Sequence, residues 1–301
     1  MISTPRSGTF LALSAFVLWG LTPVYFKWMA AENPLDIVAN RVLWSVILLT
    51  IIISLMKKWS KVKAVFSSKA GALTLVATTL LIGLNWSVFI YAVSVDRMLE
   101  TSLGYYINPL MTVGLGILFL KERPRFLQYV AMGCAMIGVS IQLFVLGYLP
   151  WISIVLALSF SVYGFLHKKT PTDSFSSLFI ETAMLLPFAL LFMGYLFQTG
   201  GEAVNNPVGP ANRDWMTWLM LMLAGPVTTL PLLLFSSAAK KVPLSTLGFL
   251  QYVSPSMIFL LAIFVYKEPL LLETGLTFAF IWLGLVIFSI DSLRRKPSLR
   301  P

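Results

Sequence analysis

The chain has 301 residues, of which 58% are hydrophobic and 11% are charged, with a formal net charge of +10. A soluble globule this apolar could not cover its surface with polar groups, and a disordered chain requires low hydrophobicity, so both classes are excluded. One Cys and one His exclude an internal disulfide and a metal cluster of the Cys/His kind. The composition therefore indicates an integral membrane protein.

Ten mostly apolar stretches are each long enough to cross a bilayer, which takes about 20 residues of helix. In chain order they are 9–28, 37–56, 72–93, 100–120, 128–147, 149–166, 178–198, 214–236, 244–266 and 271–290. The first is not expected to be a cleaved signal peptide, because Trp19-Gly20 and Pro23 stand where a cleavage site needs small residues. We therefore predict an all-α integral membrane protein with ten transmembrane helices.

The basic residues gather in every second connection between these spans, and such a bias marks the cytoplasmic side. With the N-terminus placed inside, the inner segments hold Arg6, the lysines of 57–69, Lys121, Arg123, Arg125, Lys168, Lys169, Lys240, Lys241, Arg294, Arg295, Lys296 and Arg300. Only Arg97, Arg213 and Lys267 fall in outer loops. Both termini are therefore expected inside. Because the charge is spread over many segments, nucleic acid is not expected as a partner.

The second half of the chain repeats the first. At a constant offset of 146 residues, Tyr106, Pro109, Lys121-Glu122 and Gly138 align with Tyr252, Pro255, Lys267-Glu268 and Gly284. Each half, 1–147 and 148–301, then holds five spans of one membrane domain. Because five is odd, the second half enters the membrane from the opposite side. Two inverted five-helix repeats are typical of secondary transporters, whose binding site lies near the bilayer midplane.

The candidate site lies where a proline interrupts the fourth and the ninth span, because discontinuous helices expose backbone groups that must be satisfied by protein or by a wet cavity. Each proline loosens the carbonyl four residues earlier. The kinks are placed at Pro109 and Pro255, and the side chains expected to bind substrate there are Tyr105, Tyr106, Asn108, Gln251, Tyr252, Asn85 and Trp86, with Trp19 and Trp282 for stacking. Simple packing is the alternative for the kinks and the tryptophans, and a bond between two helices is the alternative for Asn85.

Three ionisable residues fall inside the spans, namely Lys27, Arg41 and Glu181. A charge in this position is costly, so function is the first hypothesis. Arg41 and Glu181 occupy matching places near the starts of the second and the seventh span. Because these spans begin on opposite sides, we predict that the two residues do not pair. Lys27 and Arg41 are expected to cluster near Glu32 and Asp36, where Arg41 would attract a substrate carboxylate.

Glu181 is expected on the inner side, near His167, Lys168 and Lys169. The candidates for proton coupling or gating are Glu181, Lys27 and His167. Burial would raise the affinity of Glu181 for a coupling proton. Snorkelling to the headgroups is the alternative for the lysines, and an interfacial position is the alternative for His167.

Catalytic motifs are missing from the sequence. It contains no HExxH or GxSxG motif and no glycine-rich phosphate loop. Enzyme activity is therefore not expected, and neither a cofactor nor a metal is predicted.

Short motifs along nearly the whole chain point to one family. They are Trp19-Gly20, Pro23-Val24-Tyr25-Phe26-Lys27, Arg41-Val42-Leu43-Trp44-Ser45, Asn85-Trp86, the run 102–109 (SLGYYINP), Glu181-Thr182, the run 245–252 (STLGFLQY) and the run 277–282 (TFAFIW). Together they resemble the RarD-type permeases, in the EamA branch of the drug/metabolite transporter superfamily. The resemblance implies a multi-pass protein of the bacterial inner membrane that exports or takes up small organic molecules.

The sequence thus predicts a secondary carrier, or permease, that moves a small metabolite or drug-like molecule by alternating access, with the substrate and membrane lipids as partners. Coupling to a proton is a hypothesis. One alternative is a non-transporting subunit or regulator of another membrane complex, which the polar, kinked pair of spans disfavours. The other is a lipid scramblase, because the sequence leaves open whether the cavity faces lipid.

The predicted orientation can be checked by cysteine labelling. Single cysteines are introduced in a Cys134→Ser background and exposed to a membrane-impermeant reagent in intact cells. Sites in the 199–213 loop should be labelled from outside, whereas sites in 57–71 should react only after the cells are opened. The reverse pattern would contradict an inside N-terminus.

Overall fold

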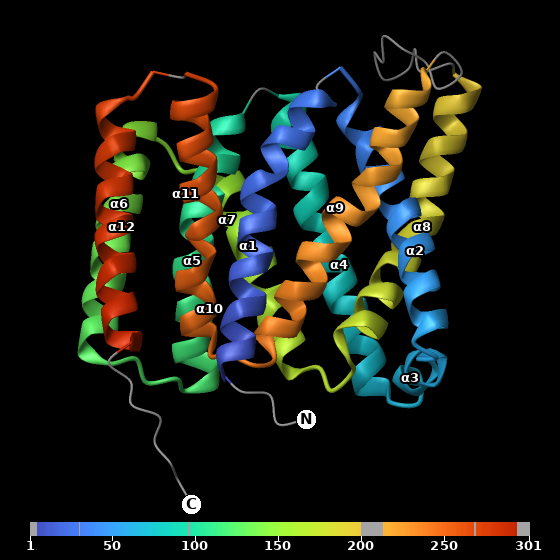
Figure 1. The fold of residues 1–301 in the computed structure, drawn as a ribbon, viewed down its shortest axis with the longest axis horizontal. Coiled ribbons are helices and arrows are strands. Elements are labelled where there is room, and N and C mark those ends of the chain that lie inside the picture. Colours follow the sequence, from blue (N-terminus) through green and yellow to red (C-terminus); the bar gives the residue numbers. More distant parts are fainter. Residues whose placement is uncertain (1–4, 30, 96, 200–212, 268, 294–301) are drawn as a thin grey trace, which may run out of the picture.

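The computed structural model describes residues 5–29, 31–95, 97–199, 213–267 and 269–293, which form a bundle of helices (Figure 1). These are α1 (Pro5–Trp28), α2 (Pro34–Leu55), α3 (Trp59–Val65), α4 (Lys69–Ser94), α5 (Met98–Leu120), α6 (Phe126–Leu146), α7 (Trp151–Lys169), α8 (Ser174–Gln198), α9 (Trp215–Ala239), α10 (Leu244–Gln251), α11 (Val253–Leu260), the π-helical turn η3 (Leu261–Val265) and α12 (Leu272–Leu293).

Ten helical segments of the described chain are long and apolar enough to cross a membrane. One of them, Leu244–Val265, is built from α10, α11 and η3 in succession, and the short α3 is not among the ten. The prediction of an all-α protein with ten spans is confirmed. Most of the 199–213 loop, used in the labelling experiment, lies outside the described residues.

Successive spans run in alternate directions, so the bundle has two ends (Figure 1). We call the end where α1 begins and α12 finishes the N-face, and the other end the opposite face. The short helix α3 lies on the N-face, which also holds the connections 121–125, 170–173 and 240–243.

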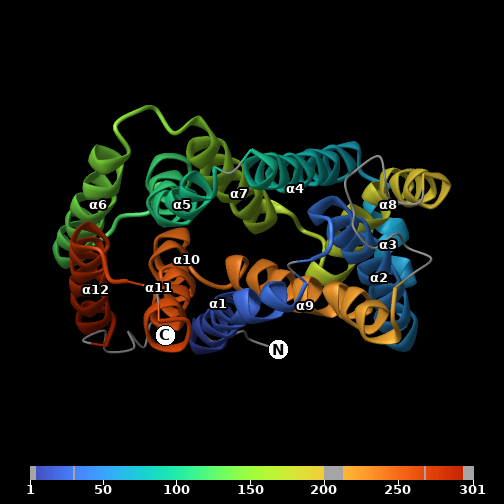
Figure 2. The ribbon, with the colours of Figure 1, turned by 90° about the horizontal axis from the view of Figure 1, so that it is seen from above.

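The helix contacts come in matched sets that relate each span to the span five places later. The contact between α5 and α7 in one set is matched by the contact of α10 and α11 with α1 in the other. In the same way, the contact between α1 and α9 is matched by that between α7 and α4. Equivalent helices also pack on one another as α2–α8, α5–α10 and α6–α12. Seen from above, α6 and α12 form one end of the bundle, and α2 and α8 form the other (Figure 2). This is the arrangement that two inverted repeats require.

Reciprocal contacts of two glycines hold α6 against α12. A Cβ on Gly138 would lie 2.9 Å from the carbonyl oxygen of Thr277, and a Cβ on Gly284 would lie 2.8 Å from that of Ala131. Both pairs, 138 with 284 and 131 with 277, are 146 residues apart. The Thr277 hydroxyl also donates to the Gly138 carbonyl at 3.2 Å. The repeat seen in the sequence is therefore a two-fold relation in the packing.

The fourth and the ninth span respond differently to their prolines. In the second half the helix breaks at Tyr252, between α10 and α11, three residues before Pro255. In the first half α5 continues through Pro109. Near the proline, the Tyr106 carbonyl accepts a hydrogen bond from the Tyr252 hydroxyl at 3.2 Å. The predicted interruption is therefore found in the ninth span, whereas the fourth remains one helix.

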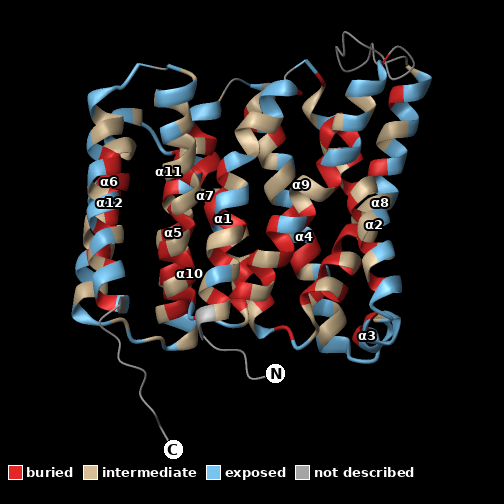
Figure 3. Cartoon of the chain, viewed as in Figure 1, coloured by how far each residue is buried: buried red, intermediate tan, exposed pale blue. Residues whose placement is uncertain are grey.

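Large apolar side chains are exposed on the outer surface of the bundle, where exposed residues cover much of α6 and α12 (Figure 3). Phe144 and Phe126 of α6 are 89% and 79% exposed. Such a surface would be unstable in water but is favourable against lipid chains. The fold thus agrees with a bilayer as its solvent.

The crossing of α5 and α10 yields a stability prediction. A Cβ on Gly248 would lie 2.7 Å from both the Pro109 oxygen and Val113 Cγ2, whereas a Cβ on Gly114 meets nothing within 4 Å. Gly248→Ala should lower the free energy of unfolding by about 1–3 kcal/mol through overpacking. Gly114→Ala, the matched control, should leave it unchanged or raise it by up to about 1 kcal/mol. Thermal unfolding in detergent measures both, and equal effects would contradict this close approach.

Candidate functional site

Arg41 is held inside the bundle by aromatic side chains. It lies seven residues after the start of α2, about 10 Å along the helix at 1.5 Å per residue. Its guanidinium carbon stands 3.7 Å from the ring centroid of Trp86 on α4, a cation–π contact. The phenol groups of Tyr25 on α1 and Tyr105 on α5 lie within electrostatic range of it. Four helices of the first half therefore converge on one cation.

Arg41 forms no hydrogen bond or ion pair with any residue that the structure describes, and its Nε is buried without a partner. A guanidinium has five N–H donors, so an unpaired one in a membrane span is exceptional. Tyr25 does not compensate for this, because its hydroxyl donates to the Met220 carbonyl at 2.8 Å. The donors of Arg41 thus remain available for a ligand.

The predicted cluster of Lys27 and Arg41 with two acids contains no ion pair between these bases and acids in the described chain. Glu32 and Asp36 both pair with Arg213, which enters from the α8–α9 connection and is itself buried. The distance from Arg213 Nη2 to Glu32 Oε2 is 2.6 Å. Lys27 instead lies over the Tyr266 ring, 3.7 Å from its centroid. Because Arg213 forms the ion pairs with both acids, Arg41 has no counter-ion in the described chain.

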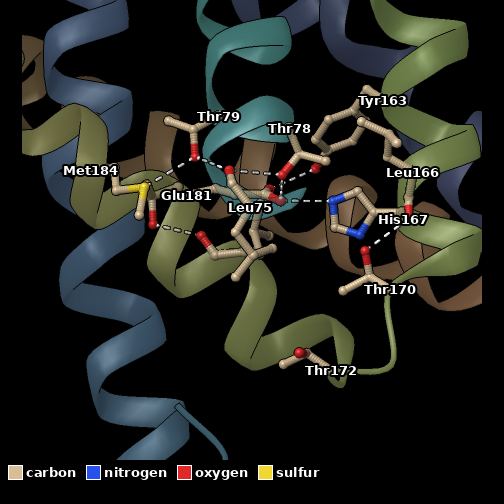
Figure 4. A network of polar contacts seen from close by, with 12 residues as sticks. Leu75, Thr78, Thr79, Tyr163, Leu166, His167, Thr170, Thr172, Glu181 and Met184 are labelled. Atoms are coloured by element: carbon tan, nitrogen blue, oxygen red, sulfur yellow. Dashed lines mark hydrogen bonds and ion pairs between the residues drawn. The ribbon is translucent and has the colours of Figure 1, made fainter. Parts of the chain in front are cut away.

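Glu181 lies at the centre of a second polar cluster, near the N-face (Figure 4). It is seven residues into α8 and 1% exposed. Its Oε1 accepts from the Thr78 hydroxyl at 2.6 Å and lies 2.9 Å from His167 Nε2, while its Oε2 accepts from the Tyr163 hydroxyl at 3.0 Å. Helices α4, α7 and α8 therefore meet at one carboxylate.

His167 is fully buried, so the interfacial position considered for it is wrong. The sequence expectation that Glu181 lies near His167 agrees with this contact, while Lys168 is directed to the carbonyls of Ala239 and Val242. Lys169 lies over the Phe165 ring. No contact joins Glu181 to Arg41 in the described chain, as expected for residues near opposite ends of the bundle.

The tyrosines of the fourth and the ninth span meet, but in a packed core. Tyr106 and Tyr252 are 9% and 1% exposed and lie among Leu103, Phe278 and Ile281. Burial of this kind leaves little room for a ligand, so they serve the α5–α10 contact. Tyr105 is on another side of α5 and is 48% exposed. Of the tyrosines predicted at the site, it is the one that stands near Arg41.

Two of the predicted asparagines join helices. Asn85 Nδ2 donates to the Leu156 carbonyl at 2.9 Å and to Ser159 Oγ at 3.0 Å, which fastens α4 to α7. Asn108 Oδ1 accepts from Ser161 Oγ at 2.8 Å, which fastens α5 to α7. One polar atom of each side chain, Asn85 Nδ2 and Asn108 Oδ1, is thus already used. Gln251 differs, because both polar atoms of its buried amide have no partner among the described residues.

The predicted stacking residues take different positions. Trp19 packs in an aromatic cluster with Phe16, Phe160 and Phe235. Trp282 donates from Nε1 to Ser256 Oγ at 2.9 Å and is 36% exposed. Both prolines are buried. In the part of the chain that the structure describes, no group of three or more His, Cys, Asp or Glu residues could hold a metal ion.

The sequence analysis missed the ties between helix ends. Glu100, fully buried, accepts from the Tyr148 hydroxyl at 3.1 Å and from the Ile152 amide at 3.3 Å. Glu122 accepts from the Leu244 and Ser245 amides at the start of α10, at 2.7 and 2.9 Å. The sequence did contain a signal for these contacts, because an acidic residue at the boundary of a span can stabilise the N-terminus of a helix. The partner helix is, however, invisible in sequence.

Comparison with known proteins covers nearly the whole chain. The model of the EamA-like transporter family matches twice, at residues 6–144 and 148–290. A relative from Vibrio cholerae serotype O1, described as an uncharacterized transporter, is 46% identical over 98% of this chain and 96% of its own length. Protein RarD of Escherichia coli strain K12 is 40% identical over 96% and 95%.

A more distant relative, the chloramphenicol-sensitive protein RarD of Pseudomonas aeruginosa, is 30% identical over 97% of both chains. A protein of known crystal structure superposes with a TM-score of 0.71 over 96% of this chain and 99% of its own, at 17% identity. This last likeness concerns the fold alone.

The separation of the two charged centres can be measured with double-mutant cycles. Arg41→Met and Glu181→Gln should change the free energy of unfolding additively, within about 0.5 kcal/mol, because the residues share no partner. Arg213→Met and Glu32→Gln, the matched pair in direct contact, should show a coupling energy above about 1 kcal/mol. A coupling of similar size in both cycles would contradict the placement of Arg41 and Glu181.

Proposed function

The chain belongs to the EamA-like transporter family, and from this premise we propose that it is a secondary transporter for a small organic anion. It is a multi-pass membrane transporter, and the comparisons with bacterial relatives support a place in the bacterial inner membrane. The proposal adds the substrate class and the mechanism, which is alternating access. The single observation that carries it is the unpaired guanidinium of Arg41.

The charge of Arg41 argues for an anionic group on the substrate. An arginine at the centre of a spanning helix costs about 2.5–3.5 kcal/mol even on the most lenient scale, and Arg41, the eighth of 22 residues of α2, bears a part of that cost. Here no carboxylate of the described chain offsets that cost, since Glu32 and Asp36 are taken by Arg213. A carboxylate brought by the substrate would satisfy the donors bidentately. We therefore assign the Arg41 guanidinium as the group that binds the substrate carboxylate.

The surroundings of Arg41 argue for an organic substrate over a bare inorganic ion. Trp86 covers one face of the guanidinium, and the half-exposed ring of Tyr105 stands nearby. Aromatic rings bury large apolar area and offer weak polar contacts at their edges. An inorganic ion would gain nothing from such walls, whereas the carbon skeleton of a metabolite would pack against them.

Alternating access requires contacts between the two halves at each face, and the contacts at one face must break while those at the other face remain. At the opposite face, Arg213 joins the α8–α9 connection to Glu32, just before α2, and to Asp36, in the first turn of α2. At the N-face, Glu122 of the first half caps α10 of the second. The halves 1–147 and 148–301 would therefore rock about the α5–α10 and α6–α12 contacts, breaking one tie while keeping the other. Inverted repeats supply two such equivalent conformations.

The substrate class can be tested in proteoliposomes with small carboxylates and their neutral methyl esters. The wild type should take up at least one carboxylate in preference to its ester. Arg41→Gln should lower that uptake by about ten- to a hundredfold, since a hydrogen bond to a charged group contributes about 1.5–3 kcal/mol. Arg123→Gln removes an exposed arginine from the α5–α6 connection and should have no such effect.

Four outcomes would contradict this proposal. Preference for the esters, or equal uptake by wild type and Arg41→Gln, would remove the anion from the substrate class. If a folded wild type moves no solute at all, a non-transporting subunit would become the better reading. Lipid movement between leaflets, measured with labelled phospholipid in the same vesicles, would instead favour a scramblase.

A further inference from the structure

We propose that Glu181 and His167 form a buried binding site for a single proton, which couples substrate movement to a proton gradient. This inference rests on the proposed transport function but concerns a different part of the bundle. It is carried by the geometry around Glu181, where an acid of α8 and the one histidine of the chain, on α7, are buried together between two membrane spans (Figure 4).

The pair is enclosed on all sides. Glu181 is 1% and His167 0% exposed, and the distance between Oε1 and Nε2 is 2.9 Å. A buried carboxylate without a counter-charge costs several kcal/mol. A single proton held by the pair would remove that cost.

Two neighbouring hydroxyls decide where the proton sits. The Tyr163 and Thr78 hydroxyls both donate to the carboxylate, at 3.0 and 2.6 Å. Donors of this kind stabilise the ionised form of an acid. The proton is therefore placed on the imidazole, as an ion pair of imidazolium and carboxylate. Neither ring nitrogen has a hydrogen-bond partner in the described chain, and Nε2 contacts Glu181 Oε1 through the 2.9 Å ion-pair distance alone. Nδ1 is therefore free to pass a proton on.

Several charged groups lie on the helices around the pair, among them Lys168 and Lys169 on α7, Lys61 and Lys63 on α3 and Lys69 on α4. On α2 the charged residues, Asp36 and Arg41, lie in the first three turns near the opposite face. At the start of α8, Asp173 pairs with Lys58, 3.5 Å away. Lys240, at the end of α9, is within electrostatic range of Glu181. Burial lowers the pKa of Lys240, and the negative charges of Asp173 and Glu181 raise it by less. The Lys240 ammonium group donates a hydrogen bond to the Thr172 carbonyl. None of these replaces His167 as the direct partner.

The coupling step follows from burial. When the N-face opens, water reaches the pair, the imidazolium transfers its proton to a water molecule, and hydronium leaves. The carboxylate that remains is held by the two hydroxyls and by water. Closure removes that water, so the deprotonated pair would carry an uncompensated buried charge. Closing is therefore favoured only after a proton has been rebound, which ties the conformational cycle to proton binding.

Nuclear magnetic resonance can observe this proton directly, because His167 is the one histidine in 301 residues. The full chain is produced with ¹⁵N-labelled histidine and purified without a histidine tag. The wild-type ring at neutral pH should show the pattern of two protonated nitrogens. Glu181→Gln should show a neutral ring, since an amide cannot balance the imidazolium, and Glu181→Asp should restore the charged pattern.

The control for this measurement is Lys169→Gln, an exposed residue two positions further along α7, which should keep the wild-type spectrum. A neutral ring in the wild type, or a charged ring in Glu181→Gln, would overturn the proposal. If Glu181→Gln fails to fold, Glu181→Asp still tests the proposal. A neutral histidine ring in folded Glu181→Asp would then contradict it.

Transport provides the second arm. In proteoliposomes, substrate uptake by the wild type should change at least several-fold when a pH gradient is imposed, whereas the ratio with and without the gradient should be one for Glu181→Gln. Lys169→Gln should respond like the wild type. A gradient response that persists in Glu181→Gln would refute coupling through this pair. If the wild type moves no solute, the proposed function fails, while the resonance experiment still decides the proton site.

Discussion

Inside a bilayer, each polar group of the protein needs a partner within the protein, because lipid offers none. Most of this bundle obeys that constraint through hydroxyl and amide groups that reach from one helix to the next. Asn85 and Asn108 fasten α7 to its neighbours, and Thr229 donates to Ser45 between α9 and α2 at 2.7 Å. The helices are consequently positioned by polar contacts as well as by apolar packing.

Some of the exceptions to that constraint lie where we propose function. Arg41 Nε, the amide of Gln251 and Nδ1 of His167 are buried without partners among the described residues. A native core rarely leaves such groups unpaired, because each costs about 1–3 kcal/mol. A protein that binds and releases a polar substrate or a proton must, however, hold groups whose partner is absent for part of its cycle.

The inverted repeat explains why two opposite charges occupy matching positions. Arg41 is the eighth residue of α2 and Glu181 the eighth residue of α8, and these helices are equivalent but run in opposite directions. The same depth in each half is therefore reached from opposite faces. One half presents a cation within aromatic rings, and the other presents an acid within hydroxyls and an imidazole.

The ten spans and the repeat were determined by the sequence alone, because span length, apolar content and a 146-residue register are local or periodic properties of the chain. The choice of side chains for the site was decided only by the tertiary structure. Tyr106 and Tyr252 align in sequence and do meet, but the helix rotation buries them, whereas Tyr105, one residue away, remains open. Similarly, only the folded chain shows that Arg213 takes the acids expected near Arg41. Rotation about a helix axis and contacts across long loops follow from packing of the whole bundle, which no local pattern records.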